Sequence, residues 1–221
     1  MQAFSVQQSH PFLVARFDAP QDMLSWSLTR PGFVTAGSVA WLQVDDDDLT
    51  IDVDPVALLR RRMEEAGHGD AVHLMTSRSL DNHTLARADA GTINATCLAT
   101  VGLSNAGRVG EAVDHAAPVG TINLLVHIDA PLSPAARIEA LSIATAARTA
   151  AVMDLGLRRD GHLVTGTGTD CIVVASPPGA PQIPYAGLHT DAGLALGRAV
   201  YRAIRKGGLG WLAERPTWPP R

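Results

Sequence analysis

The stretch TGTGTD, residues 165–170, combines glycines, hydroxyls and a carboxylate, which phosphate-binding loops and hydrolytic sites both use. A phosphate loop follows a strand and opens a helix, so that helix amides meet the phosphate. Here the glycines precede the apolar run 171–175 and no lysine follows, which disfavours a phosphate site. Two interpretations remain open: a tight turn, or the polar edge of a pocket. The candidate pocket residues are Gly166, Thr167, Gly168, Thr169 and Asp170.

Two asparagines stand beside glycines in similar settings. Asn105 lies in the turn VGLSNAG after an apolar run, and Asn123 lies at the start of the next one, in GTINLL. An asparagine amide can donate to a developing oxyanion in acyl transfer. It can equally form a turn by bonding to nearby backbone. The residue pattern alone leaves both roles open.

A lone charge and a histidine complete the set of candidates. Arg148 lies in the middle of an otherwise apolar predicted helix, where an unpaired buried charge is costly. Its guanidinium therefore either reaches the surface or pairs with an acid, for which Asp170 is the candidate; a paired Arg148 would suit a carboxylate or phosphate ligand. His189 precedes the last predicted helix, where it is either an exposed residue near the cap or a general acid–base group.

The remaining metal-binding and thiol patterns are weak. His127 and Asp129 alternate along a predicted strand, a spacing compatible with metal ligation, but two residues do not form a site. The acidic run 45–48 lacks the spacing of a calcium loop and is typical of a solvated turn. Cys97 and Cys171 show no C-x-x-C spacing, which indicates a reducing compartment. We predict no metal and no cofactor.

Composition excludes several classes of protein. The 221 residues carry a net charge of −4, with no basic run longer than residues 60–62, so no nucleic-acid partner is expected. No signal-peptide pattern opens the chain, and no apolar run reaches the roughly 20 residues that span a bilayer. We expect a cytoplasmic protein without a membrane partner. Whether it forms a homo-oligomer stays open.

Hydrophobic periodicity and the residues typical of helix starts and ends predict one domain that contains both helices and strands. A cap, a first-turn proline and a terminal glycine delimit helices at 55–66 and 134–155, and a third helix runs from Thr190 to Gly207. The second helix is apolar nearly all round and is predicted to be buried. Strands are predicted at 12–17, 23–28, 33–44, 71–76, 92–103, 122–128 and 171–175. The expected fold class is α/β, a single domain over 1–221 in which a mixed sheet is layered with about three main helices, with N-terminal strands in hairpins and an irregular tail at 208–221.

Six segments, taken in order, resemble the adenosylcobinamide amidohydrolase family of cobalamin salvage. They are LMTSR (74–78), VGLSNAGRVGE (101–111), GTINLLV (120–126), ATAARTAAVMDLGL (144–157), TGTGTDCIVVAS (165–176) and DAGLALGRAVYRAI (191–204). The resemblance covers about residues 20 to 206. In the family pattern the second helix often carries an acidic residue, an alanine and a lysine; here Ala146, Ala147 and Arg148 stand there, so the acidic residue is absent and the basic position is retained as arginine.

The resemblance implies hydrolysis of the amide that joins aminopropanol to the corrin ring of adenosylcobinamide, which yields adenosylcobyric acid. A corrinoid would then be the small-molecule partner. Asp170 would be the base or the residue that orients one, Asn105 and Asn123 would donate to the oxyanion or the amide, and His189 would be the acid. Thr167 and Thr169 would position substrate. A non-catalytic corrinoid-binding or regulatory protein, or an amidohydrolase for another amide, are the alternatives.

Overall fold

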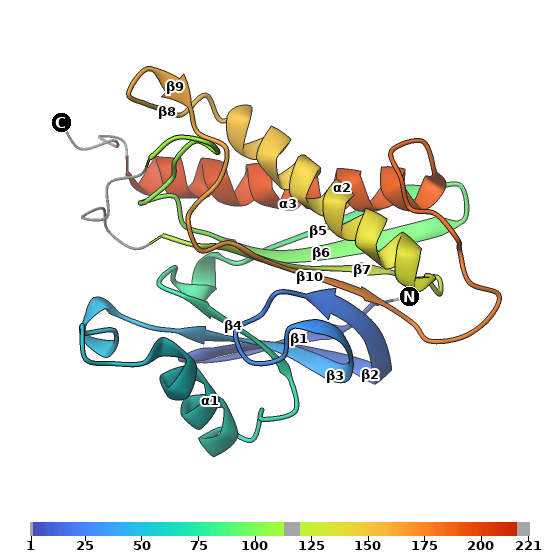
Figure 1. Ribbon diagram of the computed structural model, residues 1–221, viewed down its shortest axis with the longest axis horizontal. Coiled ribbons are helices and arrows are strands. Elements are labelled where there is room, and N and C mark those ends of the chain that lie inside the picture. The colour runs from blue at the N-terminus through green and yellow to red at the C-terminus, as the bar shows by residue number, and fades with distance from the viewer. Residues whose placement is uncertain (1, 113–119, 216–221) are drawn as a thin grey trace.

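A computed structural model describes residues 2–112 and 120–215 of the chain (Figure 1). Its strands are β1 (Ser5–Ser9), β2 (Phe12–Ser25), β3 (Gly32–Gln43), β4 (Val72–Thr76), β5 (Thr84–Ala90), β6 (Ile93–Val101), β7 (Ile122–Ile128), β8 (Arg158–Arg159), β9 (His162–Leu163) and β10 (Cys171–Ser176). Its helices are α1 (Pro55–Glu65), α2 (Pro134–Met153) and α3 (Asp191–Glu214), with short 3-10 turns at Asp46–Asp48 and Leu80–Asn82.

Eight strands form one mixed sheet in the order β4-β3-β2-β10-β7-β6-β5, with β1 paired to β2. The β3–β4 and β7–β10 pairs are parallel, and the other pairs are antiparallel. The N-terminal strands β1, β2 and β3 form antiparallel hairpins, as predicted. The prediction of a single mixed α/β domain with three main helices is therefore confirmed in the described part of the chain.

The sheet bends where β10 meets β2, and its two halves face each other (Figure 1). One buried cluster joins the halves and includes Trp41, Leu74, Leu98, Leu125 and Val173. A second lies between the β5-β6-β7-β10 half and the helices α2 and α3. A third lies under α1 on the other half. The result is four layers, helix–sheet–sheet–helix, each of which buries its apolar face against the next.

Local capping explains where the helices begin. Asp54 accepts hydrogen bonds from the first-turn amides of α1, and Ser133 and Thr190 do the same for α2 and α3. Pro55 and Pro134 occupy the first turn, where a missing amide hydrogen costs nothing. All three predicted helix starts are confirmed.

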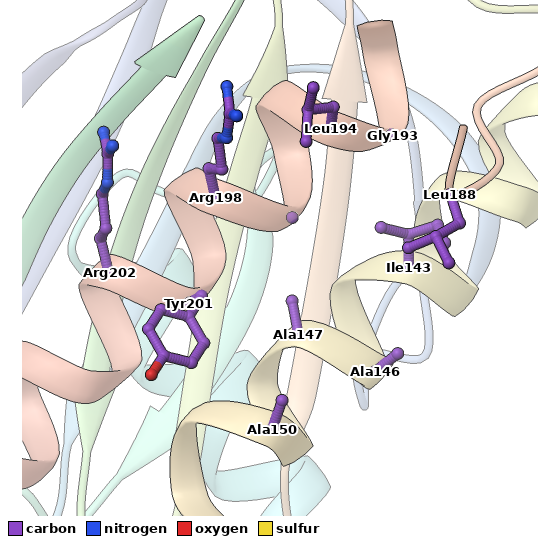
Figure 2. Close-up of a pocket in the computed structure, with 11 residues that line it drawn as sticks. Ile143, Ala146, Ala147, Ala150, Leu188, Gly193, Leu194, Arg198, Tyr201 and Arg202 are labelled. Atoms are coloured by element: carbon purple, nitrogen blue, oxygen red, sulfur yellow. The ribbon is translucent and has the colours of Figure 1, made fainter. Parts of the chain in front are cut away.

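The prediction that α2 is buried is wrong. Only one face of α2 is buried, through residues such as Ala136, Ala140 and Ala144, and Ile138 on another face is 56% exposed. Alanine is apolar yet loses little when it is exposed, so an alanine-rich helix can be an outer layer. Figure 2 shows the resulting apolar groove between α2 and α3, in which Arg198 and Arg202 point away from α2.

Two boundary predictions also need correction. Residues 12–25 form one strand with a register irregularity between Arg16 and Gln21, in place of two separate strands. Helix α3 does not stop at Gly207 but continues to Glu214, so residues 208–214 are not an irregular tail. A Cβ at Gly207 would meet Val101 Cγ2 at 2.7 Å, so this glycine marks close packing of α3 on β6. Residues 216–221 of the predicted tail lie outside the described residues.

Among the residues that the structure describes, no helix is both long and apolar enough to cross a lipid bilayer.

Candidate active site between the two halves of the sheet

A cavity of about 570 Å³ opens between the two sheet halves. It lies where β7 and β10 begin side by side, with Asn123 opposite Cys171, and where β4 ends at Thr76. Polar side chains gather at this end because strand ends carry turn residues, while the strand interiors carry the apolar core. The volume falls within the range of about 300–1,000 Å³ that is typical of small-molecule sites.

Four hydrogen bonds from the protein hold the carboxylate of Asp170 in place. Its Oδ1 accepts hydrogen bonds from Ile122 N, at 3.2 Å, and from the Thr167 hydroxyl. Its Oδ2 accepts from Thr167 N, at 3.3 Å, and from the guanidinium of Arg148. A carboxylate has about four lone-pair sites, and here all four are used. Burial raises the pKa of Asp170, while Arg148 and these hydrogen bonds act in the opposite direction.

Arg148 therefore pairs with Asp170, which was one of the two possibilities left open by the sequence. Both side chains are buried, with 13% and 7% exposed for Arg148 and Asp170. Arg148 also donates to Thr165 O at 3.3 Å, so it ties α2 to the glycine–threonine loop. Both of these bonds come from Nη1, while Nε is buried without a hydrogen-bond partner among the described residues, so only part of the guanidinium is committed to the protein.

The glycines of the loop make room for this pair. A Cβ on Gly166 would lie 2.9 Å from Asp170 Oδ2 and 3.0 Å from Arg148 Cζ, too close for a side chain. Gly168 has open space around it and lines the cavity. The Thr169 hydroxyl bonds to the Thr121 hydroxyl at 2.8 Å and donates to Gly120 O at 3.2 Å. Thr167 contacts Asp170 and is absent from the cavity wall, whereas Thr169 is part of it.

The two asparagines differ in position. Asn123 is buried at the cavity wall, and its Nδ2 donates to Met75 O at 2.6 Å. That bond assigns the amide orientation, and no other described residue bonds to the Asn123 side chain, which leaves one Nδ2 hydrogen and Oδ1 for a ligand. Asn105 packs behind the wall, where its Oδ1 lies 3.0 Å from the Cβ position of Gly120. Its Oδ1 is buried and has no hydrogen-bond partner among the described residues, and Asn105 is not among the residues that line the cavity.

His189 is not part of this site. It is exposed and precedes α3, whose first residue Asp191 lies against the turn at Gly91, between β5 and β6. That turn is at the opposite end of the sheet from Asn123, because β6 runs antiparallel to β7 and Val101 pairs with Ile122. His189 therefore does not lie beside Asp170, because the polypeptide between Cys171 and His189 crosses the length of the sheet; its role as an acid stays a prediction without support from this geometry.

His73 is a cavity residue that the sequence analysis did not select. Its Nε2 bonds to His68 O at 2.9 Å, and its Nδ1 bonds to the Thr29 hydroxyl at 2.9 Å. A carbonyl can only accept, so Nε2 carries the hydrogen and Nδ1 accepts from Thr29. Burial lowers the pKa of His73, which is consistent with this neutral ring. The only signal in the sequence was one histidine inside the apolar run 71–76.

An apolar rim surrounds the mouth of the cavity and was also missed. Trp26 and Leu28 are 42% and 53% exposed, and Leu49 and Val56 line the same cavity. The indole of Trp26 donates from Nε1 to Asp170 O at 2.7 Å, so its ring is fixed against the loop. The sequence analysis placed Trp26 in a strand at 23–28, whereas β2 ends at Ser25, so Trp26 follows the strand.

The other candidate groups have structural partners. His127 Nε2 contacts Gln21 Oε1 at 3.1 Å, and both oxygens of Asp129 accept from Asn94. Within the described residues, no three His, Cys, Asp or Glu side chains are placed to hold a metal ion. Burial raises the pKa of Cys171 to about 12, so its thiol stays protonated at neutral pH, as the interpretation of an inert cysteine expects. The acidic run contributes Asp48 to an ion pair with Arg62 at 3.1 Å.

Comparison with known proteins gives consistent descriptions. An adenosylcobinamide amidohydrolase of Halobacterium salinarum is 31% identical over 147 residues, which span 63% of this chain and 59% of that protein. An adenosylcobinamide amidohydrolase of Methanosarcina mazei is 33% identical over 121 residues, 51% of this chain and 55% of that one. An uncharacterized protein of Methanocaldococcus jannaschii is 36% identical over 89 residues, 39% of this chain and 34% of that one. The matched regions therefore cover less than two thirds of each relative.

Among solved structures, a Burkholderia sp. β-aminopeptidase matches with a TM-score of 0.46 and 15% identity, over 95% of this chain and 82% of that one. A Pyrococcus horikoshii protein matches with a TM-score of 0.45 and 12% identity, over 92% and 77%. The family model described as adenosylcobinamide amidohydrolase matches residues 1–216. Because that match takes in nearly the whole chain, the protein belongs to the adenosylcobinamide amidohydrolase family.

Proposed function

We propose that this protein hydrolyses the amide between aminopropanol and a propionate side chain of the corrin ring in adenosylcobinamide. One water is consumed, and aminopropanol and adenosylcobyric acid are released. The observation that carries the proposal is convergence: three of the segments that resemble the family, at 74–78, 120–126 and 165–176, meet at the wall of one cavity. Segments so far apart in the chain have no local reason to share a pocket.

The shape and chemistry of the cavity suit a large substrate with one polar arm. In this proposal the side chain with the amide enters the cavity of about 570 Å³, and the corrin ring stays at its mouth. The exposed faces of Trp26 and Leu28 would contact the ring at the mouth. Burying these apolar faces on binding would contribute about 25 cal/mol per Å².

The polar wall would bind the amide itself. The free Nδ2 hydrogen of Asn123 would donate to the amide oxygen, where charge develops during attack. The linked hydroxyls of Thr121 and Thr169 would hold the attacking water or the leaving amine. Burial raises the pKa of Cys171 to about 12, which disfavours this thiol as the nucleophile.

Asp170 and Arg148 would act as positioning residues in this proposal. The four hydrogen bonds of Asp170 leave no lone pair for a substrate proton, so Asp170 orients the loop that carries Thr169. The proposal thus departs from both roles expected for Asp170, the base or the residue that orients a base. It also gives the retained basic position of the family pattern, Arg148, a defined partner.

The competing function is corrinoid binding without hydrolysis. It is favoured by one observation: the described wall presents no thiolate, and both ring nitrogens of His73 are already bonded. An amidohydrolase for a different amide is the third possibility. The three functions differ in product, which makes them separable in one experiment.

The test is incubation of the purified protein with adenosylcobinamide, followed by chromatography for adenosylcobyric acid and aminopropanol. We expect both products, and a loss of about 100-fold or more in kcat for Asn123→Ala, as for removal of one oxyanion donor. Glu65→Gln, on the exposed side of α1, is the matched control and should keep full activity. Saturable corrinoid binding without product would establish the binding protein instead. If neither occurs, a panel of other amides tests the third function.

A further inference from the structure

A second cavity, of about 710 Å³, lies at the other end of β7. It is bounded by the irregular part of β2 and by β5, β6 and β7, and we call it the distal cavity. His127 lines it and is on the same face of β7 as Asn123, four residues away, or about 13 Å along the strand. Leu125, which is fully buried, separates the two positions. The distal cavity shares no lining residue with the candidate active site.

Thr96 presents its side chain to the distal cavity. It pairs with His127 across β6 and β7, is only 7% exposed, and lines the cavity. Its hydroxyl makes no hydrogen bond to any other residue in the described part of the chain, so it can be reached from the cavity. A ligand in the cavity can therefore donate to this hydroxyl or accept from it.

The tautomer of His127 places a second free acceptor in the same cavity. Gln21 Nε2 donates to Ala19 O at 2.8 Å, which turns Gln21 Oε1 toward His127 Nε2, 3.1 Å away. His127 must therefore donate from Nε2, and Nδ1 keeps a bare lone pair. Burial lowers the pKa of His127 to about 4, so the ring is neutral at pH 7. No described residue bonds to Nδ1.

The charge around the distal cavity is negative. Of the described charged residues that line it, Asp18, Asp89 and Asp129 are acidic and Arg87 is basic. These groups do not form a cluster that could hold a metal ion within the described residues. Phe17 adds an aromatic ring beside His127, at 5.3 Å between centroids, and aromatic rings attract organic cations. The cavity therefore offers hydrogen-bond acceptors, a net negative charge and an aromatic ring. Together these groups suit an ammonium group on a small organic molecule.

We infer that the distal cavity binds a small primary amine that also carries a hydroxyl group. The ammonium bonds to the Asp89 side of the cavity and to Nδ1 of His127, and the hydroxyl bonds to Thr96. The amino alcohol released in the proposed reaction belongs to this class; only the choice of probe rests on the proposed function. The ligand class itself rests on the groups that line the cavity.

The test is calorimetric titration of the protein with 1-amino-2-propanol at pH 7, without any corrinoid. We expect saturable binding at one site, weakened tenfold or more by Thr96→Val and by Asp89→Asn. Thr96→Val is nearly isosteric, and Asp89 is exposed, so both variants should fold, which circular dichroism checks. Asn123→Ala, in the other cavity, should bind the amine as the unmodified protein does.

Uncharged 1,2-propanediol serves as the matched ligand control and should bind at least tenfold more weakly. Equal affinity for the diol, unchanged affinity in folded Thr96→Val, loss of binding in Asn123→Ala, or no saturable binding would each overturn the inference. Because no corrinoid is present, failure of the proposed hydrolysis would leave this experiment unaffected. Conversely, absence of amine binding would leave the hydrolysis assay unaffected.

Discussion

Arg148 and Asp170 form a buried ion pair that joins the middle of α2 to the residue directly before β10. The pair connects the outer helix layer to the loop that lines the candidate active site. The loop position, and with it Thr169, therefore depends on a contact between residues 22 apart in sequence.

Asp170→Asn should destabilise the protein because it leaves the guanidinium of Arg148 buried without a counter-charge. Removing one partner of a buried pair typically costs about 3–5 kcal/mol in the free energy of unfolding. The double variant Arg148→Met with Asp170→Asn should lose less than the sum of the two single losses, since no charge is stranded. Urea denaturation of the four proteins measures this coupling. Strictly additive losses would show that the pair contributes no interaction energy.

Gly166→Ala should push the ion pair apart, because the new methyl group would overlap Arg148 and Asp170. We expect a loss of about 1–3 kcal/mol in unfolding free energy, with a parallel loss of turnover. Gly168→Ala, two residues along the same loop, has open space and should change stability by less than about 0.5 kcal/mol. Thermal denaturation of both variants checks the difference, and equal stability of the two would contradict it.

Trp26→Ala should weaken corrinoid binding because it removes the exposed aromatic face at the cavity mouth. We expect KM for adenosylcobinamide to rise about tenfold, equivalent to about 1.4 kcal/mol, with a smaller change in kcat. Trp26→Phe keeps an aromatic face but loses the hydrogen bond to Asp170 O, so it separates stacking from loop positioning. If the Trp26→Ala variant has an unchanged KM, the corrin ring does not contact Trp26.

Acidification should destabilise the fold through His127. In the unfolded chain this residue has its ordinary pKa of 6.5, whereas burial lowers the pKa to about 4 in the folded protein. Between these values the unfolded chain binds more protons, so stability falls as pH drops from 6.5 to 4. The loss is about 3 kcal/mol for a shift of this size. Burial also lowers the pKa of His73, which acts in the same direction.

His127→Gln should therefore flatten the dependence of unfolding free energy on pH across that window. Chemical denaturation at a series of pH values between 4 and 6.5 measures it. The remaining slope would report His73 and the carboxylates. Parallel curves for His127→Gln and the unmodified protein would mean that His127 is not the group responsible.

Local features of the chain could be predicted because their causes are local. Asp54 with Pro55, and Ser133 with Pro134, determine where α1 and α2 begin, since capping involves only neighbouring amides. The strand Ile122–Ile128 was predicted with its observed bounds because its apolar run ends at polar residues. The short edge strand β5 was missed because its sequence, TLARADA, carries little of the apolar pattern that marks buried strands.

The candidate site likewise has features that the sequence could predict and features that it could not. The sequence indicated a polar loop at 165–170 and, from the cost of burying a charge, gave pairing with Asp170 as one of two possibilities for Arg148. The sequence could not show that Asn123 reaches the cavity while Asn105 packs behind it, or that His189 lies at the far end of the sheet. Gly207 was misread for the same reason, because close packing on Val101 and a helix end both favour glycine.

The sequence by itself determined the helix starts, most strand positions and the set of polar residues available for chemistry, because each depends on neighbours along the chain. Only the tertiary structure decided which of those residues meet. The bend between β10 and β2 brings the two sheet halves face to face, and that bend brings Trp26, His73 and Asn123 around one cavity. Pairing between distant strands follows from the packing of whole layers, and no short stretch of sequence encodes it.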